Sequence, residues 1–370
     1  MTDKQLKKMT KEEKLILSYL REHPQTSAPE MHQGLLKADE SFTMSLSTLK
    51  RRLCGEFMKL NLVLSLGKGK GLKYALTPEY SFVYPIDMDE YFNTENRNIF
   101  NRYNFNLMDQ LEGARLFSDA EMQELQSLQG QYEKNISQLT PAVYQMEMER
   151  LSIDLTWKSS QIEGNTYSLL DTEILLKELQ TAKGKTIAEA SMLLNHKKAI
   201  DFLLQNPDFF EALRIRDIED IHSILVEKLD IQRNLRNELV RIGGTDYQPL
   251  DNEHQIREAL QDACRLINGK KNIFEKAILA LILLSYIQAF MDGNKRVARI
   301  VANGILISNR YCPISFRTVE PSDYKKAMLI FYEQNNLSAF KRIFIEQFKF
   351  AVGEYFRVRT IQPKLGVKNE

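Results

Sequence analysis

The sequence predicts a mainly α-helical protein built from two or three folding units. Apolar residues recur at helical spacing along most of the chain from residue 140 onward. Two short stretches are exceptions: residues 62–77 alternate as β-strands do, and residues 239–250 combine β-branched residues with glycines and a proline. The chain has 370 residues, of which 43% are hydrophobic and 27% charged. This length and composition suit a globular protein with more than one core.

Residues 11–61 contain three helical patterns. The first, in residues 11–24, places Leu15, Ile16 and Leu20 on one face and stops at Pro24. The second begins with Ser27 as a helix cap, and the third covers residues 45–61. We therefore expect a compact unit of three helices before the first β-like stretch.

Residues 62–77 alternate apolar and other residues on both sides of a Gly-Lys-Gly-Lys-Gly tip, which predicts a β-hairpin. Three helices followed by a basic-tipped hairpin resemble a winged helix-turn-helix domain, which we place at residues 1–80. This segment holds 14 Lys and Arg residues against nine Asp and Glu, a net charge of +5, whereas the whole chain carries only +1. The predicted DNA contacts are the basic residues of the third helix and the hairpin, Lys50, Arg51, Arg52, Lys68 and Lys70. Protein docking is the alternative role for such a unit.

Residues 81–140 form a predicted helical connector, with a capped helix beginning at Ser118. Nine further helical segments follow, in residues 141–164, 169–182, 186–205, 214–229, 254–268, 272–290, 294–309, 321–335 and 338–358. Residues 239–250 interrupt them with β-branched side chains, Gly243-Gly244 and Pro249, which favours a short β-hairpin or flap. We expect residues 141–355 to form one all-α domain that carries this flap.

The remaining composition narrows the class of protein. Cys54, Cys264 and Cys312 lie far apart and form no zinc-binding or disulfide pattern. The charged N-terminus lacks a signal peptide, and the apolar run at residues 277–290 is shorter than a membrane span. We therefore expect a cytoplasmic protein with no membrane partner. No helix face can be assigned to a subunit interface, so self-association stays open.

The sequence "DGNKR", residues 292–296, separates an apolar helix from an amphipathic one. Backbone N–H groups at the start of the second helix lack intrahelical partners, and the helix dipole is positive there. Gly293 lets the backbone approach a ligand, and Lys295, Arg296 and Arg299 add positive charge. Asp292 is then explained by a Mg²⁺ ion bound between it and a phosphate. A simple helix cap at Asp292 is the alternative.

The stretch "FMDGNKRVAR" resembles the core motif of the Fic (Fido) family, His-Pro-Phe-x-Asp/Glu-Gly-Asn-Gly/Lys-Arg-x-x-Arg. Two other segments support this resemblance. "SSQIEGN", residues 159–165, is similar to the family's inhibitory-helix motif, with Ser159, Glu163 and Gly164 in register. "RNELVRIGGTDYQP" is similar to its substrate-docking flap. Together the matching segments span about residues 140–350.

The resemblance implies an enzyme that transfers AMP from Mg-ATP to a hydroxyl of an unidentified protein target. The implied catalytic positions are Gln288, Phe290, Asp292, Asn294 and Arg296. The implied nucleotide-binding residues are Gly293, Asn294, Lys295, Arg296 and Arg299, and Asp292 is the implied Mg²⁺ ligand. The flap residues that would align a target strand are Gly243, Gly244, Thr245, Asp246 and Tyr247. An inhibitory helix near residues 142–164 would place Glu163 against Arg299 and displace the γ-phosphate.

The core loop, residues 288–299, departs from the family motif at two positions, where the His-Pro of the motif is Gln288-Ala289. The family's catalytic histidine is Gln288 here, and an amide has no basic pKa with which to take a proton. None of the five histidines, His23, His32, His196, His222 and His254, lies within the loop in sequence. Three hypotheses follow: an impaired or silent AMP transferase, a nucleotide-sensing DNA-binding regulator, and a different phosphate chemistry such as removal of AMP with Glu163 orienting water.

Overall fold

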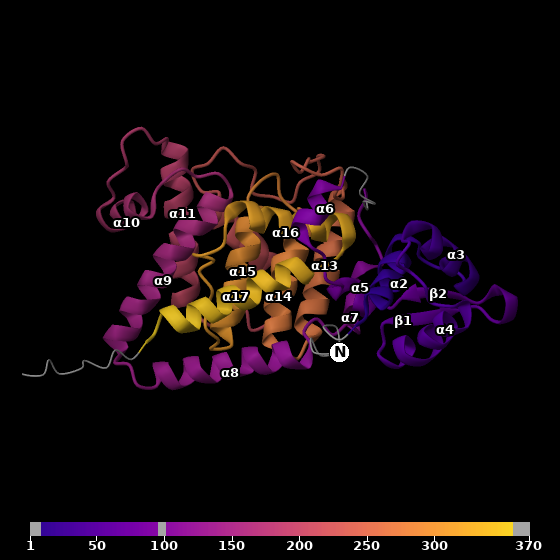
Figure 1. Cartoon of the computed structure of the whole chain (residues 1–370). Coiled ribbons are helices and arrows are strands. Elements are labelled where there is room, and N and C mark those ends of the chain that lie inside the picture. Colours follow the sequence, from indigo (N-terminus) through magenta and orange to yellow (C-terminus); the bar gives the residue numbers. More distant parts are fainter. Residues whose placement is uncertain (1–8, 95–100, 358–370) are drawn as a thin grey trace, which may run out of the picture.

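The computed structural model describes residues 9–94 and 101–357. Within these ranges the regular structure is almost entirely helical, and the sheet has two strands, β1 (Val63–Leu66) and β2 (Lys73–Leu76). Figure 1 shows a small N-terminal unit beside a larger helical body. The predicted mainly helical fold class is confirmed.

The N-terminal unit has a hydrophobic core of its own. Thr10, Ser27 and Ser45 each cap a helix by accepting a hydrogen bond from the backbone N–H three residues later. The helices are α2 (Lys11–Glu22), α3 (Ala28–Ala38) and α4 (Leu46–Arg51), and α4 continues as the π-helical segment η1 (Arg52–Phe57). Their apolar faces enclose a cluster separate from the core of the body.

The hairpin of this unit is antiparallel, with Val63 opposite Leu76 and Leu66 opposite Lys73. Its tip contains the short 3₁₀ segment η2 (Gly69–Gly71). Gly67 has a φ of 78°, and a Cβ atom there would lie 2.6 Å from the carbonyl oxygen of Gly71. The tight tip therefore requires glycine at this position.

The connector leads from this unit into the body through four helices. They are α5 (Pro78–Val83), α6 (Met88–Asn93), α7 (Leu107–Glu112) and α8 (Asp119–Ile136). Tyr80 belongs to the N-terminal core and Phe82 to the core of the body, so the two cores divide within α5. The longest connector helix, α8, packs along α17 (Ser338–Glu354).

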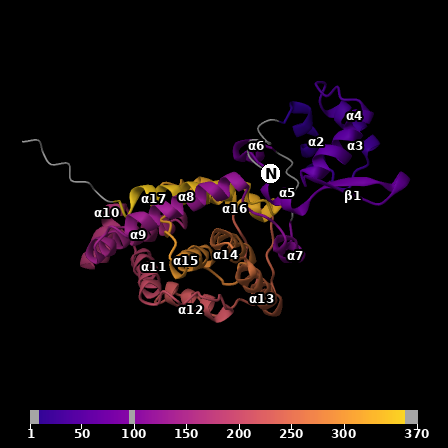
Figure 2. The ribbon, with the colours of Figure 1, turned by 90° about the horizontal axis from the view of Figure 1, so that it is seen from below.

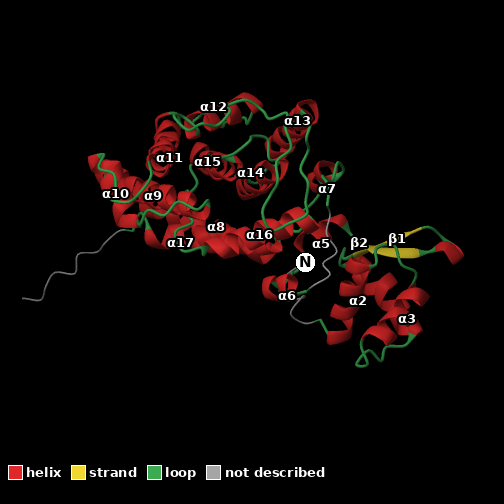
Figure 3. Cartoon of the chain, turned by 90° about the horizontal axis from the view of Figure 1, so that it is seen from above, coloured by secondary structure: helices red, strands yellow, loops and turns green. Residues whose placement is uncertain are grey.

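The body places two helices at its centre, α14 (Ile273–Ile287) and α15 (Asn294–Ser308). Figures 2 and 3 show the other helices arranged around this pair. Besides α17 they are α9 (Pro141–Ile162), α10 (Leu169–Glu178), α11 (Ile187–Gln205), α12 (Ile215–Leu225), α13 (Glu253–Gly269) and α16 (Pro321–Gln334). The connection between α14 and α15 is thus held by the most buried part of the fold.

Two predicted elements differ from the structure. Residues 239–250 form no β-hairpin: they have no regular structure apart from a turn at Gly243-Gly244 and an isolated bridge between Gln248 and Arg102. The β-branched residues there have no neighbouring strand to pair with. The helix predicted for residues 169–182 ends at Glu178, because Leu179 adopts a left-handed conformation with a φ of 56°.

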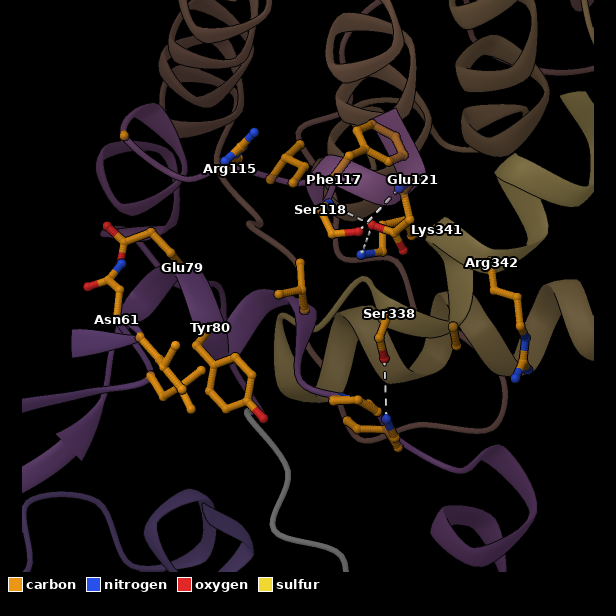
Figure 4. Close-up of a pocket in the computed structure, with 18 residues that line it drawn as sticks. Asn61, Glu79, Tyr80, Arg115, Phe117, Ser118, Glu121, Ser338, Lys341 and Arg342 are labelled. Carbon is orange, nitrogen blue, oxygen red and sulfur yellow. Dashed lines mark hydrogen bonds and ion pairs between the residues drawn. The ribbon is translucent and has the colours of Figure 1, made fainter. Parts of the chain in front are cut away.

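A cavity of about 500 Å³ lies between the N-terminal unit and the body. Figure 4 shows Tyr80 of α5, Ser118 at the start of α8 and Lys341 of α17 around it. Lys341 Nζ donates a hydrogen bond of 2.9 Å to Glu121, which ties α17 to α8 across one wall. In residues 9–94 and 101–357, no helix combines the length and apolar character needed to span a bilayer.

Candidate functional site

The candidate site is the connection between α14 and α15. Residues 277–287 of α14 are buried on every face, which fixes this helix at the centre of the body. It ends at Gln288, which adopts a left-handed conformation with a φ of 52°. The chain then turns through residues 289–293 before α15 begins. The predicted loop therefore lies between two buried helices.

Asn294 holds the loop in shape. Its side-chain Oδ1 accepts a hydrogen bond of 2.8 Å from the Phe290 N–H, and its Nδ2 donates one of 2.7 Å to the Phe290 carbonyl. The same amide nitrogen lies 3.2 Å from Gln288 Oε1. One carboxamide thus satisfies polar groups at both ends of the turn, so the loop is preorganised.

The N-terminus of α15 has no side-chain cap. Its cap is Gly293, which has a φ of 86° and no side chain to accept from the first N–H groups of the helix. Those groups and the positive end of the helix dipole favour an anion at this position. The predicted anion-binding character of residues 293–296 is consistent with this geometry.

Arg296 and Arg299 bring unpaired donors to the same place. Arg296 is 1% exposed; its Nη2 lies 3.1 Å from Asp292 Oδ2, while its Nε and Nη1 have no hydrogen-bond partner among the described residues. Arg299 is fully buried, its guanidinium lies 5.1 Å from the centre of the Tyr324 ring, and its Nη1 has no hydrogen-bond partner within the described ranges. Burying guanidinium N–H groups without acceptors is costly. These orphaned donors therefore fit a bound anion such as a phosphate.

Asp292 is the one carboxylate of the loop. Its side chain is 63% exposed, and its Oδ1 accepts a hydrogen bond of 2.6 Å from the Gly293 N–H. The described residues contain no group of three or more acidic, histidine or cysteine side chains that could hold a metal ion. Mg²⁺ commonly binds one or two carboxylates and takes its other ligands from phosphate and water. Asp292 fits that role only together with a bound phosphate.

Glu163 lies at the end of α9 and faces α15. Its Oε1 accepts a hydrogen bond of 2.8 Å from Arg299 Nη2, and its Oε2 accepts one of 3.0 Å from Lys295 Nζ. Burial alone would raise the pKa of Glu163, but Arg299 and Lys295 outweigh that effect and lower it to about 2. The carboxylate is therefore charged at neutral pH. The sequence predicted the contact with Arg299 and missed the one with Lys295.

Ser159 adds two contacts between α9 and Arg299. Its Oγ accepts a hydrogen bond of 2.8 Å from Arg299 Nε, and its carbonyl accepts one of 3.0 Å from Arg299 Nη2. Gly164, with a φ of 100°, lets the chain turn sharply after Glu163. The three residues matched to the inhibitory motif thus meet Arg299 or shape the turn that presents Glu163.

Gln288 occupies the position at which a catalytic base was expected. It is 8% exposed, and its Nε2 donates a hydrogen bond of 2.6 Å to the Ser285 carbonyl. Its Oε1 accepts from Asn294. The amide is held in the loop by these bonds and offers no group that could take a proton at neutral pH.

His222 lies against the loop, which the sequence did not reveal. Its ring stacks on Phe290 with centroids 3.7 Å apart, and its Nε2 lies 3.0 Å from the Asp292 carbonyl oxygen. Burial lowers the pKa of His222 to about 4, so the imidazole is neutral at pH 7. It comes from α12, far from the loop in sequence, and no local pattern could have indicated the contact.

The flap is anchored beneath the loop. Arg236 donates from its side chain to the carbonyls of Gln288 and Glu238, and its backbone N–H donates to the Ala289 carbonyl at 3.0 Å. Tyr247 stacks on Tyr286 and donates a hydrogen bond of 3.1 Å to its carbonyl. The predicted flap residues Gly243, Gly244, Thr245 and Asp246 lie between these anchors, and Tyr247 itself is buried.

The predicted DNA contacts lie on the N-terminal unit, away from the loop (Figure 1). Lys50, Arg51, Lys68 and Lys70 are exposed. Arg52 differs, because its guanidinium pairs with Glu13 at 3.3 Å and also with Glu56. The Arg52 charge is thus partly matched within the unit, and its contact with DNA stays a prediction.

The site is thus a turn between two buried helices, with the Glu163 carboxylate paired to Arg299 and Lys295 beside it. Residues 212–306 match the model of the Fic/DOC family. The chain is 26% identical over 170 residues to the protein adenylyltransferase fic-1 of Caenorhabditis elegans, covering 44% of this chain and 33% of that protein. It is 27% identical over 175 residues to the protein adenylyltransferase Fic of Nematostella vectensis, covering 45% and 40%. The matches span well under half of these relatives.

Solved structures share the fold of the body. Fic-1 from C. elegans, residues 134–508, has a TM-score of 0.57 at 20% identity and covers 64% of this chain and 72% of its own. A Fic-domain signalling protein from Bacteroides thetaiotaomicron has a TM-score of 0.52 at 16% identity and covers 62% and 95%. The helical body therefore has the Fic fold.

Proposed function

We propose that this chain is a Fic-type protein adenylyltransferase scaffold that binds Mg-ATP, is restrained by Glu163, and has low or no transfer activity because of Gln288. The observation that carries it is a set of buried guanidinium N–H groups of Arg296 and Arg299 that have no hydrogen-bond partner among the described residues, at the uncapped N-terminus of α15. The adenylyltransferase names of the relatives supply the reaction type.

In this proposal the α- and β-phosphates lie over residues 293–296. The backbone N–H groups and Arg296 donate to the phosphate oxygens, and the γ-phosphate reaches Arg299. Mg²⁺, held by Asp292 and phosphate oxygens, would neutralise negative charge on the leaving pyrophosphate. The target hydroxyl attacks the α-phosphorus, the bond to the β-phosphate oxygen breaks, and the hydroxyl proton passes to solvent.

Gln288 removes one part of this chemistry and leaves the rest. General-base catalysis typically contributes about 10²- to 10⁴-fold in rate. Positioning and charge stabilisation depend on the loop backbone, Arg296 and Asp292, all of which are independent of a base at residue 288. We therefore expect nucleotide binding to be retained better than transfer.

Glu163 restrains the same site. It occupies the donors of Arg299 and Lys295 that a triphosphate would need, so ATP must displace the carboxylate or bind with its γ-phosphate elsewhere. Each carboxylate oxygen accepts a hydrogen bond from a cationic side chain, which holds Glu163 against Arg299 and Lys295. This pairing with the arginine assigned to the γ-phosphate is what supports an inhibitory role.

The test combines two substitutions in the full chain. Gln288→His should raise the transfer of radiolabelled AMP from ATP to the protein itself or to added protein by about 10²-fold or more. Adding Glu163→Gly should raise it further, and Gln288→Asn is the matched control that restores no base. Absence of transfer from every variant, together with no thermal stabilisation by Mg-ATP, would refute the proposal. AMP release from a premodified protein would instead support the hydrolytic hypothesis.

A nucleotide-sensing, DNA-binding regulator is the second candidate. It is favoured by the N-terminal unit, which has its own core and exposes Lys50, Arg51, Lys68 and Lys70 on the third helix and the hairpin tip. In this case Gln288→His would transfer nothing, and duplex DNA would bind with an affinity that falls steeply with salt. Fluorescence anisotropy with labelled duplex DNA, with and without Mg-ATP, tests this function.

A further inference from the structure

We propose that His196 is a positioning residue of the inhibitory contact, which holds the Ser159 hydroxyl so that Ser159 accepts a hydrogen bond from Arg299. The inference rests on the proposed function, since it concerns how α9 holds the arginine assigned to the γ-phosphate. The inhibitory contact would then involve α11, which carries His196, as well as α9 and α15.

Three helices meet at the Ser159 hydroxyl. His196 of α11 is fully buried, and its Nε2 lies 2.7 Å from Ser159 Oγ on α9. The same oxygen lies 2.8 Å from Nε of Arg299 on α15. Helix α11 packs against both α9 and α15, so the imidazole is fixed relative to both partners. The result is a continuous chain of hydrogen bonds from Arg299 through Ser159 to His196.

The chemistry of the three groups fixes the direction of the bonds. A guanidinium can only donate, so Ser159 Oγ accepts from Arg299. The serine proton then needs an acceptor of its own. Ser152 and Ser285, also buried in helices, donate to the carbonyl four residues earlier, at 2.8 and 2.7 Å.

Ser159 differs from Ser152 and Ser285 in this respect. Among the contacts of the described residues it has no hydrogen bond to the Leu155 carbonyl, and His196 Nε2 is its remaining partner in reach. We therefore assign Nε2 of His196 as the acceptor, which places the ring proton on Nδ1, an atom with no hydrogen-bond partner among the described residues. Burial and the nearby charges of Arg299 and Arg296 lower the pKa of His196 well below its usual value, which keeps this acceptor available at neutral pH.

Loss of the imidazole acceptor would let the Ser159 hydroxyl turn back to its own helix, as serines in helices commonly do. The oxygen would then leave Arg299, and one of the three contacts that α9 makes with this guanidinium would be lost. Bonds from a charged donor are among the stronger hydrogen bonds in proteins. Arg299 would become easier for a γ-phosphate to recruit.

The measurement is the ratio of the dissociation constants for Mg-ADP and Mg-ATP, obtained by calorimetric titration of the full chain. Only ATP carries the γ-phosphate that Arg299 would meet. Freeing Arg299 therefore strengthens ATP binding and leaves ADP binding unchanged, whereas general loosening of the fold affects both nucleotides alike.

His196→Leu removes the acceptor at similar volume and should raise the preference for ATP about five- to tenfold. His196→Gln places an amide oxygen near the position of Nε2 and should stay within about twofold of the parent chain. Ser159→Ala should match His196→Leu, and the double variant should show no further increase, because His196 acts only through the hydroxyl.

The inference is overturned if His196→Leu changes ATP and ADP binding equally, or if its effect persists in full in the Ser159→Ala background. Should His196→Leu fail to fold, Ser159→Ala and His196→Gln still decide: the first must raise the ATP preference and the second must not. Glu163→Gly distinguishes a failure of the proposed function from a failure of the role of His196. If it leaves the ratio unchanged, the proposed function fails; if it raises the ratio while His196→Leu does not, only the role of His196 fails.

Discussion

Replacing Glu163 by glutamine tests how strongly this carboxylate is held between Arg299 and Lys295. The substitution keeps the size and hydrogen-bonding oxygen of the side chain and removes its charge. Arg299 is fully buried, so it would be left as a cation without an anionic partner. The structure therefore predicts a loss of stability together with a gain in anion binding.

The magnitude follows from the pKa of Glu163, which falls from its usual 4.5 to about 2. A difference of that size corresponds to about 3 kcal/mol of stabilisation at neutral pH. The Glu163 side chain is only 17% exposed, so solvent screening reduces this value little. Removing one partner of a buried ion pair commonly costs about 3–5 kcal/mol, which agrees.

Urea unfolding with and without Mg-ATP provides the assay. Glu163→Gln should lower the free energy of unfolding by about 3 kcal/mol, and Mg-ATP should restore more stability to the variant than to the parent chain. Glu173→Gln is the matched control, because Glu173 forms an exposed pair with Lys177 and should cost less than about 1 kcal/mol.

The pH dependence has a defined sign. A lowered pKa in the folded state contributes stability that is present above pH 4.5 and is lost as the pH falls toward 2. The difference between the parent chain and Glu163→Gln should therefore shrink below pH 4.5. An equally stable variant at pH 7 with no added response to Mg-ATP would refute the reasoning.

Three further predictions concern the loop and the N-terminal unit. Gly293→Ala places a side chain at a φ of 86° and should lower the melting temperature by an amount equivalent to about 1 kcal/mol. The variant should also lose all thermal stabilisation by Mg-ATP. Retained stabilisation would contradict the close approach of phosphate to this backbone. Asn294→Ala removes the three loop hydrogen bonds and should lower the free energy of unfolding, measured in urea, by about 2–3 kcal/mol. A decrease under about 1 kcal/mol would mean that the loop holds its shape without these bonds. Lys70→Ala should reduce the salt dependence of DNA binding by about one phosphate contact. Arg52→Ala should mainly destabilise the N-terminal unit, because Arg52 pairs with Glu13. Equal effects of both variants on DNA affinity would contradict the internal pairing of Arg52.

Much of the site was predictable because it is encoded locally. A glycine before an amphipathic helix, with basic residues in the first turn, predicts an anion-binding helix start from short-range physics alone. The motif that ends in Glu163 was recognisable for the same reason. The position of Asn294 was also expected, although its role in tying Phe290 to Gln288 became clear only from the structure.

The contacts that could not be predicted join helices that are distant in sequence. His222 stacks on Phe290, and His196 meets Ser159, because α12 and α11 pack against α15 and α9. Neither histidine stands in a local pattern that indicates its partner. The contact of Lys295 with Glu163 was missed because a lysine beside a phosphate-binding turn is equally suited to a phosphate.

The flap shows the limit of strand propensity. Residues 239–250 have the β-branched residues and glycines of a hairpin, yet they form no strand pair, since a strand forms only when a neighbour supplies the backbone hydrogen bonds. The helix after Ser168 was predicted too long because nothing in the sequence indicates the left-handed conformation of Leu179.

A crystal structure of Glu163→Gly with Mg²⁺ and a non-hydrolysable ATP analogue tests the central claim most directly. The account predicts phosphate oxygens on the backbone N–H groups of residues 293–296, and a terminal phosphate that accepts from Arg299. An analogue bound elsewhere, or bound with its phosphates away from the start of α15, would contradict it.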